Sequence, residues 1–292
     1  MKNFLLICLG ILLAQHLVAQ NDVYQTFRDR WVIDVPSVET LPKQKLDARI
    51  THRFGDLAGD AGGWPTMYGL ENAADVAMGF EYGISNSLTA GIARSKGAGP
   101  LRQLVTTSLK YKLLAQREAG TPLTLSAVGM ATVSTTKKSS DPSSVNFFEK
   151  SSHRMVYYVT LLAARKFSEK FSAQLSVGLT HRNVVPAGDE NQIVHTGLAF
   201  RAQLSRVLGI IGDVTLPLNG NQSPFKDLKP ANANYQIPIG LGLEFDTGGH
   251  VFQLNFTNTT GIMPTDYIPY TRSNWLDGQF RIGFTISRIF NL

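Results

Sequence analysis

Cysteine is nearly absent from this sequence. The 292-residue chain contains one cysteine, Cys8, inside an apolar stretch near its N-terminus. A secreted domain that depends on disulfides needs an even set of cysteines, and a thiolate metal site needs several close together. Cys8 also stands too early, and lacks the small preceding residues, for a lipidated cysteine. The sequence therefore predicts a fold without disulfides and without a thiolate-bound metal.

Long apolar runs are also missing. Beyond the N-terminus, no stretch approaches the roughly eighteen continuous apolar residues that indicate a membrane-spanning helix. The run at 4–13 follows Lys2 and precedes the pair Ala19-Gln20, which is the layout of a secretory signal peptide. We expect residues 1–19 to be removed after Ala19. The protein would then be exported, and any membrane crossing must use strands.

Charged residues make up only 17% of the chain, below the roughly 25% of soluble domains. The formal net charge is +6, but the basic residues are scattered singly, which argues against nucleic-acid binding in an exported protein. The sequence has no Gly-x-Ser-x-Gly, His-x-x-x-His or His-Glu-x-x-His motif, the usual marks of a hydrolase elbow or a zinc site. We therefore predict no catalytic residue, no metal and no cofactor.

The sequence is rich in alternation of large apolar residues with small or polar ones. Val76, Met78, Phe80 and Tyr82 are separated by single small or charged residues, so they share one face of a strand. About twelve segments have this period of two. They are residues 46–54, 75–84, 88–94, 105–113, 123–133, 155–163, 171–180, 194–204, 208–216, 236–245, 252–257 and 280–287. The pattern predicts an all-β fold.

Two architectures contain strands with one apolar face. A soluble sandwich or lipocalin-like barrel points that face inward, whereas a transmembrane barrel points it toward lipid. The long segments, their even number and the Gly, Ser and Thr on their polar faces favour the membrane barrel. The connections alternate between long and short, as outer loops and periplasmic turns do. We therefore predict an up-and-down antiparallel transmembrane β-barrel of about twelve strands over residues 45–292.

The segment before the first strand, residues 20–44, contains Pro36 and Pro42 and little periodicity. We consider two interpretations of it: a periplasmic N-terminal tail, or a short plug around Trp31-Val32-Ile33. No internal repeat or low-complexity tract divides the rest of the chain. One barrel domain preceded by this segment is therefore the simplest division.

Several stretches resemble a known family. They are Thr51-His52-Arg53-Phe54-Gly55, Tyr68-Gly69-Leu70, Gly79-Phe80-Glu81-Tyr82-Gly83-Ile84, Leu88-Thr89-Ala90-Gly91-Ile92-Ala93-Arg94 and Leu109-Lys110-Tyr111-Lys112-Leu113-Leu114. Together they resemble an uncharacterised family of membrane-bound β-barrel proteins of Gram-negative bacteria. The resemblance extends over most of the mature chain. It implies a membrane barrel and brings with it no activity or catalytic residue.

Ionisable residues on the polar strand faces would line the interior of such a barrel. The candidates are Glu81, Lys110, His195, Arg201, Glu244 and Arg281. They can form a selectivity filter or solute path, or a polar core that fills a narrow barrel through salt bridges and hydrogen bonds. We favour the polar core, although the small residues on the same faces are also compatible with an open channel.

The C-terminal segment has the alternation that the outer-membrane assembly machinery reads. Phe280, Ile282, Phe284 and Ile286 alternate with small or polar residues, and Phe290 supplies an aromatic residue near the end. The last residue is Leu292 instead of Phe or Trp, which departs from that signal. We expect the barrel assembly machinery to be a partner.

Taken together, these features predict an outer-membrane β-barrel that is a small-solute pore or transporter, or a binding scaffold, and is not an enzyme. Its expected partners are outer-membrane lipid, the assembly machinery and a small solute. Two alternatives stay open. One is a soluble periplasmic ligand-binding barrel. The other is a membrane-embedded lipid hydrolase or acyltransferase, which would use a Ser and a His near the lipid boundary.

Overall fold

The computed structural model describes residues 23, 25–118, 120–144, 146–226 and 234–292. The expected signal peptide, residues 1–19, and its cleavage after Ala19 lie outside the described residues. Among the described residues, no helix is long and apolar enough to cross a membrane.

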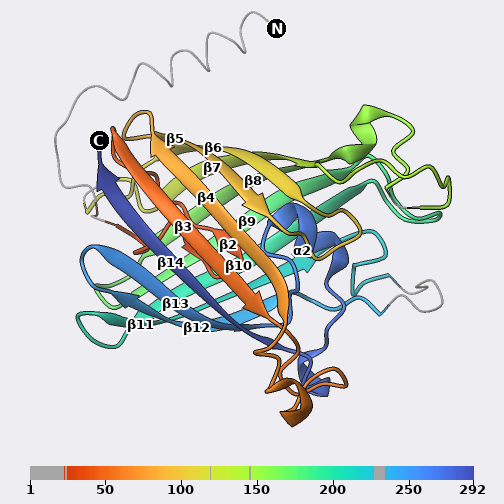
Figure 1. The fold of residues 1–292 in the computed structure, drawn as a ribbon. Helices are drawn as coiled ribbons and strands as arrows, with labels where there is room; N and C mark the ends of the chain where they lie inside the picture. The colour runs from red at the N-terminus through yellow and green to blue at the C-terminus, as the bar shows by residue number, and fades with distance from the viewer. Residues whose placement is uncertain (1–22, 24, 119, 145, 227–233) are drawn as a thin grey trace, which may run out of the picture.

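Twelve strands of the described chain form one closed antiparallel barrel (Figure 1). They are β3 (Lys45–Phe54), β4 (Ala73–Gly83), β5 (Leu88–Ser95), β6 (Leu104–Leu114), β7 (Thr124–Ser134), β8 (Met155–Lys166), β9 (Phe171–Arg182), β10 (Gln192–Gln203), β11 (Leu208–Pro217), β12 (Ile239–Asp246), β13 (His250–Thr257) and β14 (Arg281–Asn291). Each pairs with its neighbours in sequence, and β14 closes the ring on β3, from Gly283 opposite Arg53 to Asn291 opposite Lys45. The predicted fold class and strand number are confirmed.

The bulky apolar side chains of the strands point out of the barrel. In β13, Phe252 and Leu254 are exposed, whereas Gln253 and Asn255, which alternate with them, are buried. Met78, Phe80, Leu175, Val177 and Leu241 are exposed in the same way. Since successive side chains of a strand face opposite sides, the polar positions line the interior. An apolar outside and a polar inside is the arrangement of a transmembrane barrel and the reverse of a soluble one.

Connections of different length gather at opposite ends of the barrel. Residues 84–87, 115–123, 167–170, 204–207 and 247–249 connect strands at one end, here the turn end, where the chain also terminates. The connections at the other end, here the loop end, are 96–103 and 183–191 and the longer ones, of which the described parts are 55–72, 135–144 with 146–154, 218–226 with 234–238, and 258–280. The loop end carries η2 (Trp64–Thr66), η3 (Ser151–Arg154), α2 (Pro264–Tyr270) and η4 (Trp275–Asp277). This alternation agrees with the connection lengths expected from the sequence.

The described residues just before the barrel wall lie inside the barrel. Residues 25–41, here the lumenal segment, contain β1 (Trp31–Val32) and β2 (Val35–Pro36), which pair as a small antiparallel hairpin. Ile33, at the turn of this hairpin, has a φ of 49°, the left-handed region that two-residue hairpin turns use. Most of the segment from Thr26 to Leu41 is buried, although no strand of the wall pairs with it.

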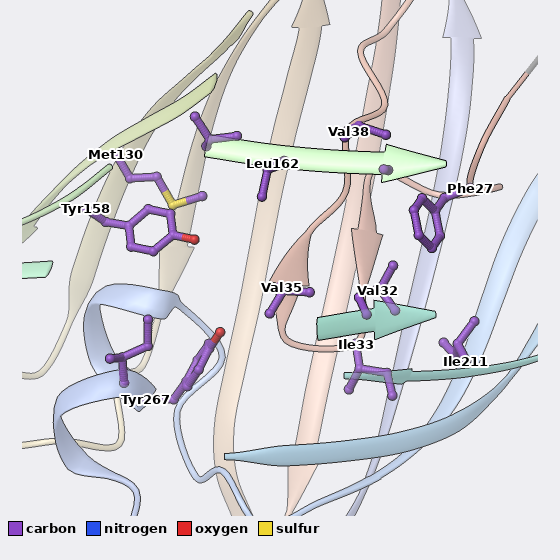
Figure 2. Close-up of a cluster of buried hydrophobic side chains, with 14 of the residues drawn as sticks. Phe27, Val32, Ile33, Val35, Val38, Met130, Tyr158, Leu162, Ile211 and Tyr267 are labelled. Carbon is purple, nitrogen blue, oxygen red and sulfur yellow. The ribbon is translucent and has the colours of Figure 1, made fainter. Parts of the chain in front are cut away.

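A second insertion enters from the loop end. α2 belongs to the connection between β13 and β14 and is buried along nearly its whole length. Its Tyr267 and Ile268 join Val32, Ile33 and Val35 of the lumenal segment in one apolar cluster (Figure 2). Wall residues complete this cluster, among them Met130, Tyr158, Leu162, Ile193 and Ile211. The middle of the barrel is thus filled by parts of the same chain.

Candidate functional site: the filled lumen

Ion pairs connect the lumenal segment to β3. The carboxylate of Asp29 pairs with the guanidinium of Arg49, and that of Asp34 pairs with Arg53. In a third pair the segment supplies the cation and the wall supplies the acid: Arg30 lies 2.7 Å from the Asp47 carboxylate. Asp47, Arg49 and Arg53 are two or four residues apart on one strand, so all three point inward. Both partners of the Asp34 and Arg53 pair are almost completely buried.

Wall side chains also bind the backbone of the segment. The Lys110 ammonium of β6 donates to the carbonyl oxygens of Arg30 and Glu39, at 3.0 and 3.1 Å. The Asp213 carboxylate of β11 accepts from the backbone N–H groups of Asp34 and Val35, at 2.7 and 3.2 Å. These wall groups supply the partners that backbone N–H and C=O groups require when they are buried.

Gln174 of β9 binds the segment with both ends of its amide. Its Oε1 accepts from the N–H of Val38 and its Nε2 donates to the carbonyl of Pro36, each at 2.9 Å. Ser126 of β7 donates to the carbonyl of Val38, at 2.8 Å. Side chains of β3, β6, β7, β9 and β11 therefore hold the segment, and β3 and β9 lie on opposite sides of the twelve-strand ring.

The residues that the sequence singled out divide into three groups. Glu81 and Lys110 contact the lumenal segment, since Glu81 accepts a hydrogen bond of 3.0 Å from the Trp31 indole N–H. Arg201 and Glu244 are buried and paired with each other, at 2.6 Å. His195 and Arg281 contact neither the segment nor that pair.

His195 is almost fully buried, and its ring stacks on Tyr158. Arg281 donates to the Ser273 hydroxyl at 2.9 Å, near the loop end. The side chains that hold the segment, Asp29, Asp34, Arg49, Arg53 and Asp213, were not singled out from the sequence. The alternation of β3 places Arg49 and Arg53 inward, and that of β11 places Asp213 inward, so this signal was present for three of the five.

A small cavity lies beside the lumenal segment. It occupies about 50 Å³ between the segment and the wall, which is room for water and for little else. Its lining includes Trp31, Ile33, Ala77, Gly79 and Gly91. A larger space of about 300 Å³ opens at the turn end, beside Arg28, Arg30, Asp246, His250 and Ser287. The lumenal segment and α2 thus occupy the middle of the barrel, and open spaces lie toward the turn end and the loop end.

The inserted loop is held by a buried acid. The Asp266 carboxylate of α2 accepts from the backbone N–H groups of Ala98 and Gly99, at 2.8 and 2.9 Å. Burial, helped by the nearby Asp75, raises the pKa of Asp266 from 3.8 to about 7, although the two backbone hydrogen bonds oppose the shift. Within the described ranges, no group of three or more His, Cys, Asp or Glu side chains could hold a metal ion.

Comparison with solved structures finds other barrels. The COG4313 outer membrane channel from Pseudomonas putida F1 is 13% identical over 88% of this chain and 100% of that one, with a TM-score of 0.51. The NanC porin is 9% identical over 85% and 99%, with a TM-score of 0.47. The Acinetobacter baumannii outer membrane protein Omp33 is 10% identical over 85% and 99%, with a TM-score of 0.41. At these identities the likeness concerns the fold alone, and no curated protein matches the chain.

A family match is more informative. The sequence model of the membrane bound beta barrel domain matches residues 27–290. This range includes the barrel and nearly all of the lumenal segment, so the two form one domain in that description. The resemblance noted from the sequence is confirmed, and the chain belongs to the membrane bound beta barrel domain family (DUF5777).

Proposed function

We propose that this protein is an outer-membrane channel for a small solute, closed by its own lumenal segment and by α2. The observation that carries the proposal is the polar character of the contact between segment and wall. Ion pairs and hydrogen bonds from Arg49, Arg53, Lys110, Gln174 and Asp213 hold the segment. A hydrogen bond to a charged group is worth about 1.5–3 kcal/mol net, because water replaces it when the contact opens.

A scaffold with a permanently filled lumen is the second candidate. The apolar cluster around Val35, Tyr158 and Tyr267 favours it, because exposing those side chains to water costs roughly 25 cal/mol for each Å². In that case the barrel would present its loops to a partner and pass no solute. The two candidates differ in one measurable property, which is ion conductance.

The soluble barrel and the membrane-embedded hydrolase both lose support. A soluble ligand-binding barrel needs its apolar faces inside, whereas Leu241 and Leu254 face outward. A hydrolase of the Ser and His type needs a serine hydroxyl bonded to a histidine ring. Among the described residues, the one histidine ring with a side-chain hydrogen bond is His181, and its partner is Asn183. The proposal therefore includes no enzymatic step.

The proposed location also names partners. Outer-membrane lipid would cover the outward apolar faces, and the assembly machinery would read β14. Ile282, Phe284 and Ile286 occupy alternate positions of β14, and Phe290 lies near its end. Phe280 precedes the strand and stacks on Trp275, with ring centroids 4.6 Å apart. If β14 carries the assembly signal, its strand residues are thus better candidates than Phe280.

The structure offers a way to lock the segment. A Cβ added at Gly240 of β12 would lie 3.0 Å from Ile33 Cγ2 of the hairpin turn, so side chains at positions 33 and 240 meet directly inside the barrel. The sequence has no cysteine after Cys8. The double variant Ile33→Cys with Gly240→Cys can therefore form a disulfide between hairpin and wall, and each single variant is a matched control.

The test is conductance of the purified full chain in planar bilayers. We expect the wild type and both single variants to conduct in bursts, and the oxidised double variant to stay closed until a reductant is added. Equal conductance before and after reduction would show that the segment does not close the channel. Silence of every variant, with heat-modifiable gel migration proving that each is folded, would favour the scaffold.

A further inference from the structure

Three acidic side chains of the lumenal segment occupy three basic positions of the wall. Asp29 pairs with Arg49, Asp34 pairs with Arg53, and Glu39 lies 4.0 Å from the Lys112 ammonium. Arg49 and Arg53 belong to β3 and Lys112 belongs to β6, so the basic groups come from separate parts of the wall. The three carboxylates belong to one continuous stretch of the lumenal segment, from Asp29 to Glu39, and each lies against one of these basic groups.

The two arginines keep unused donors beside their carboxylates. Within the described part of the chain, the Nε atoms of Arg49 and Arg53 are buried and have no hydrogen-bond partner. An arginine can hold a carboxylate with two parallel N–H bonds. Here each arginine donates to its aspartate from one terminal nitrogen only, Arg49 to Asp29 and Arg53 to Asp34. Each of the two arginines therefore binds a carboxylate and still has an N–H donor, at Nε, that no acceptor uses.

The balance of charge changes if the segment leaves the lumen. It carries Asp29, Asp34 and Glu39 against Arg28 and Arg30, so it removes more negative charge than positive. By strand alternation, the inward ionisable groups left on β3, β4, β6 and β11 are five cations, Lys45, Arg49, Arg53, Lys110 and Lys112, and four acids, Asp47, Asp75, Glu81 and Asp213.

Among these acids, Asp75 already accepts backbone N–H bonds from Gly97 and Ile262, at 2.9 and 3.0 Å. Its negative charge is thus partly offset by groups other than these cations. The vacated side of the wall would be cationic, and in a narrow low-dielectric path such a charge concentrates anions.

From this geometry we propose that Arg49, Arg53 and Lys112 form a binding path for small solutes that carry carboxylate groups. Asp29, Asp34 and Glu39 of the lumenal segment take the place of the solute's carboxylates while the barrel is closed. The inference rests on the proposed channel function and adds the class of solute to it. It also explains why the segment is held by acids at these positions.

The test cuts the same ion pair from its two sides. Asp34→Asn and Arg53→Gln both remove the pair and both should loosen the segment, but only Asp34→Asn leaves the cation on the wall. In a potassium chloride gradient across a planar bilayer, the Asp34→Asn channel should prefer chloride over potassium several-fold more than the Arg53→Gln channel does. Asp29→Asn and Arg49→Gln form a second such pair if one of the first does not fold.

Two controls separate the possible failures. Arg165→Gln removes an exposed arginine from the outer face of β8 and should leave the ion preference of the wild type unchanged. Conductance with equal ion preference in Asp34→Asn and Arg53→Gln would overturn the inference and leave the channel standing. Absence of conductance from all folded variants would overturn the channel itself.

A blocking experiment tests the class of solute. Citrate should reduce the chloride current through Asp34→Asn and have a much smaller effect on Arg53→Gln. Sulfate at the same ionic strength supplies a comparison anion without carboxylates. Equal reduction by sulfate and citrate would overturn the assignment to carboxylates.

Discussion

The His195 imidazole of β10 lies parallel to the Tyr158 phenol of β8, with ring centroids 5.3 Å apart and an angle of 2° between the ring planes. Strand β9 runs between them, and its Gly178 is opposite both Thr160 and His195. The two rings can meet across β9 because Gly178 has no side chain. A Cβ there would lie 2.5 Å from His195 Cε1, closer than real contacts allow.

This relationship predicts a stability effect. Gly178→Ala should lower the free energy of unfolding by about 1–3 kcal/mol, the usual cost of overpacking a filled interior. Gly129→Ala is the matched control, because a Cβ at Gly129 meets nothing within 4 Å. Guanidinium unfolding in lipid vesicles would measure both, and an equal response of the two variants would contradict the assigned packing.

If the outward apolar side chains contact lipid, a charge placed among them should lower the stability of the barrel. Leu254 of β13 is 39% exposed on the outer face, and Leu254→Arg should cost roughly 2–4 kcal/mol if that position is at the bilayer midplane. Leu276→Arg is the control, since Leu276 is 94% exposed in a connection at the loop end. The same vesicle unfolding assay checks both, and an unchanged stability of Leu254→Arg would contradict the lipid contact.

The docking of α2 should depend on pH. The pKa of Asp266 is raised by burial from 3.8 to about 7, so the docked loop binds a proton that the released loop loses above about 4. Stability from this group is therefore fully present below pH 3.8 and is lost as the pH rises to about 7.

Hydrogen exchange of residues 258–280 between pH 4 and pH 8 measures this stability. We expect exchange, corrected for its intrinsic pH dependence, to show more frequent opening toward pH 7 in the wild type. Asp266→Asn, which cannot ionise, should show no such trend. A wild-type profile as flat as that of the variant would contradict the raised pKa.

The position of the lumenal segment can be checked by fluorescence. The chain has three tryptophans, and the double variant Trp64→Phe with Trp275→Phe leaves Trp31 alone, half-buried and bonded to Glu81. Its emission should be blue-shifted and weakly quenched by acrylamide. A variant that retains only Trp64, which is 77% exposed, should be strongly quenched. Strong quenching of Trp31 would mean that the segment lies outside the barrel.

The strands could be predicted from the sequence because their pattern is local. Alternation such as that of Val76, Met78, Phe80 and Tyr82 needs no knowledge of distant residues, since the period of two is a property of the extended backbone itself. The same rule assigned Glu81, Lys110 and Glu244 to the interior. Connection lengths could also be read directly, and they indicated which connections share an end.

What fills the lumen was decided only by the tertiary structure. The contacts that hold the segment join residues far apart in sequence, as Val38 with Gln174 and Asp34 with Asp213 do. The periodicity of the sequence does not reveal such contacts. Each of them forms only when the closed barrel brings a complementary wall side chain next to its partner in the segment. The sequence by itself therefore determined a membrane barrel with a polar inner wall. Only the closed ring, which sets which polar groups face each other across the interior, determined that residues 25–41 and α2 occupy it.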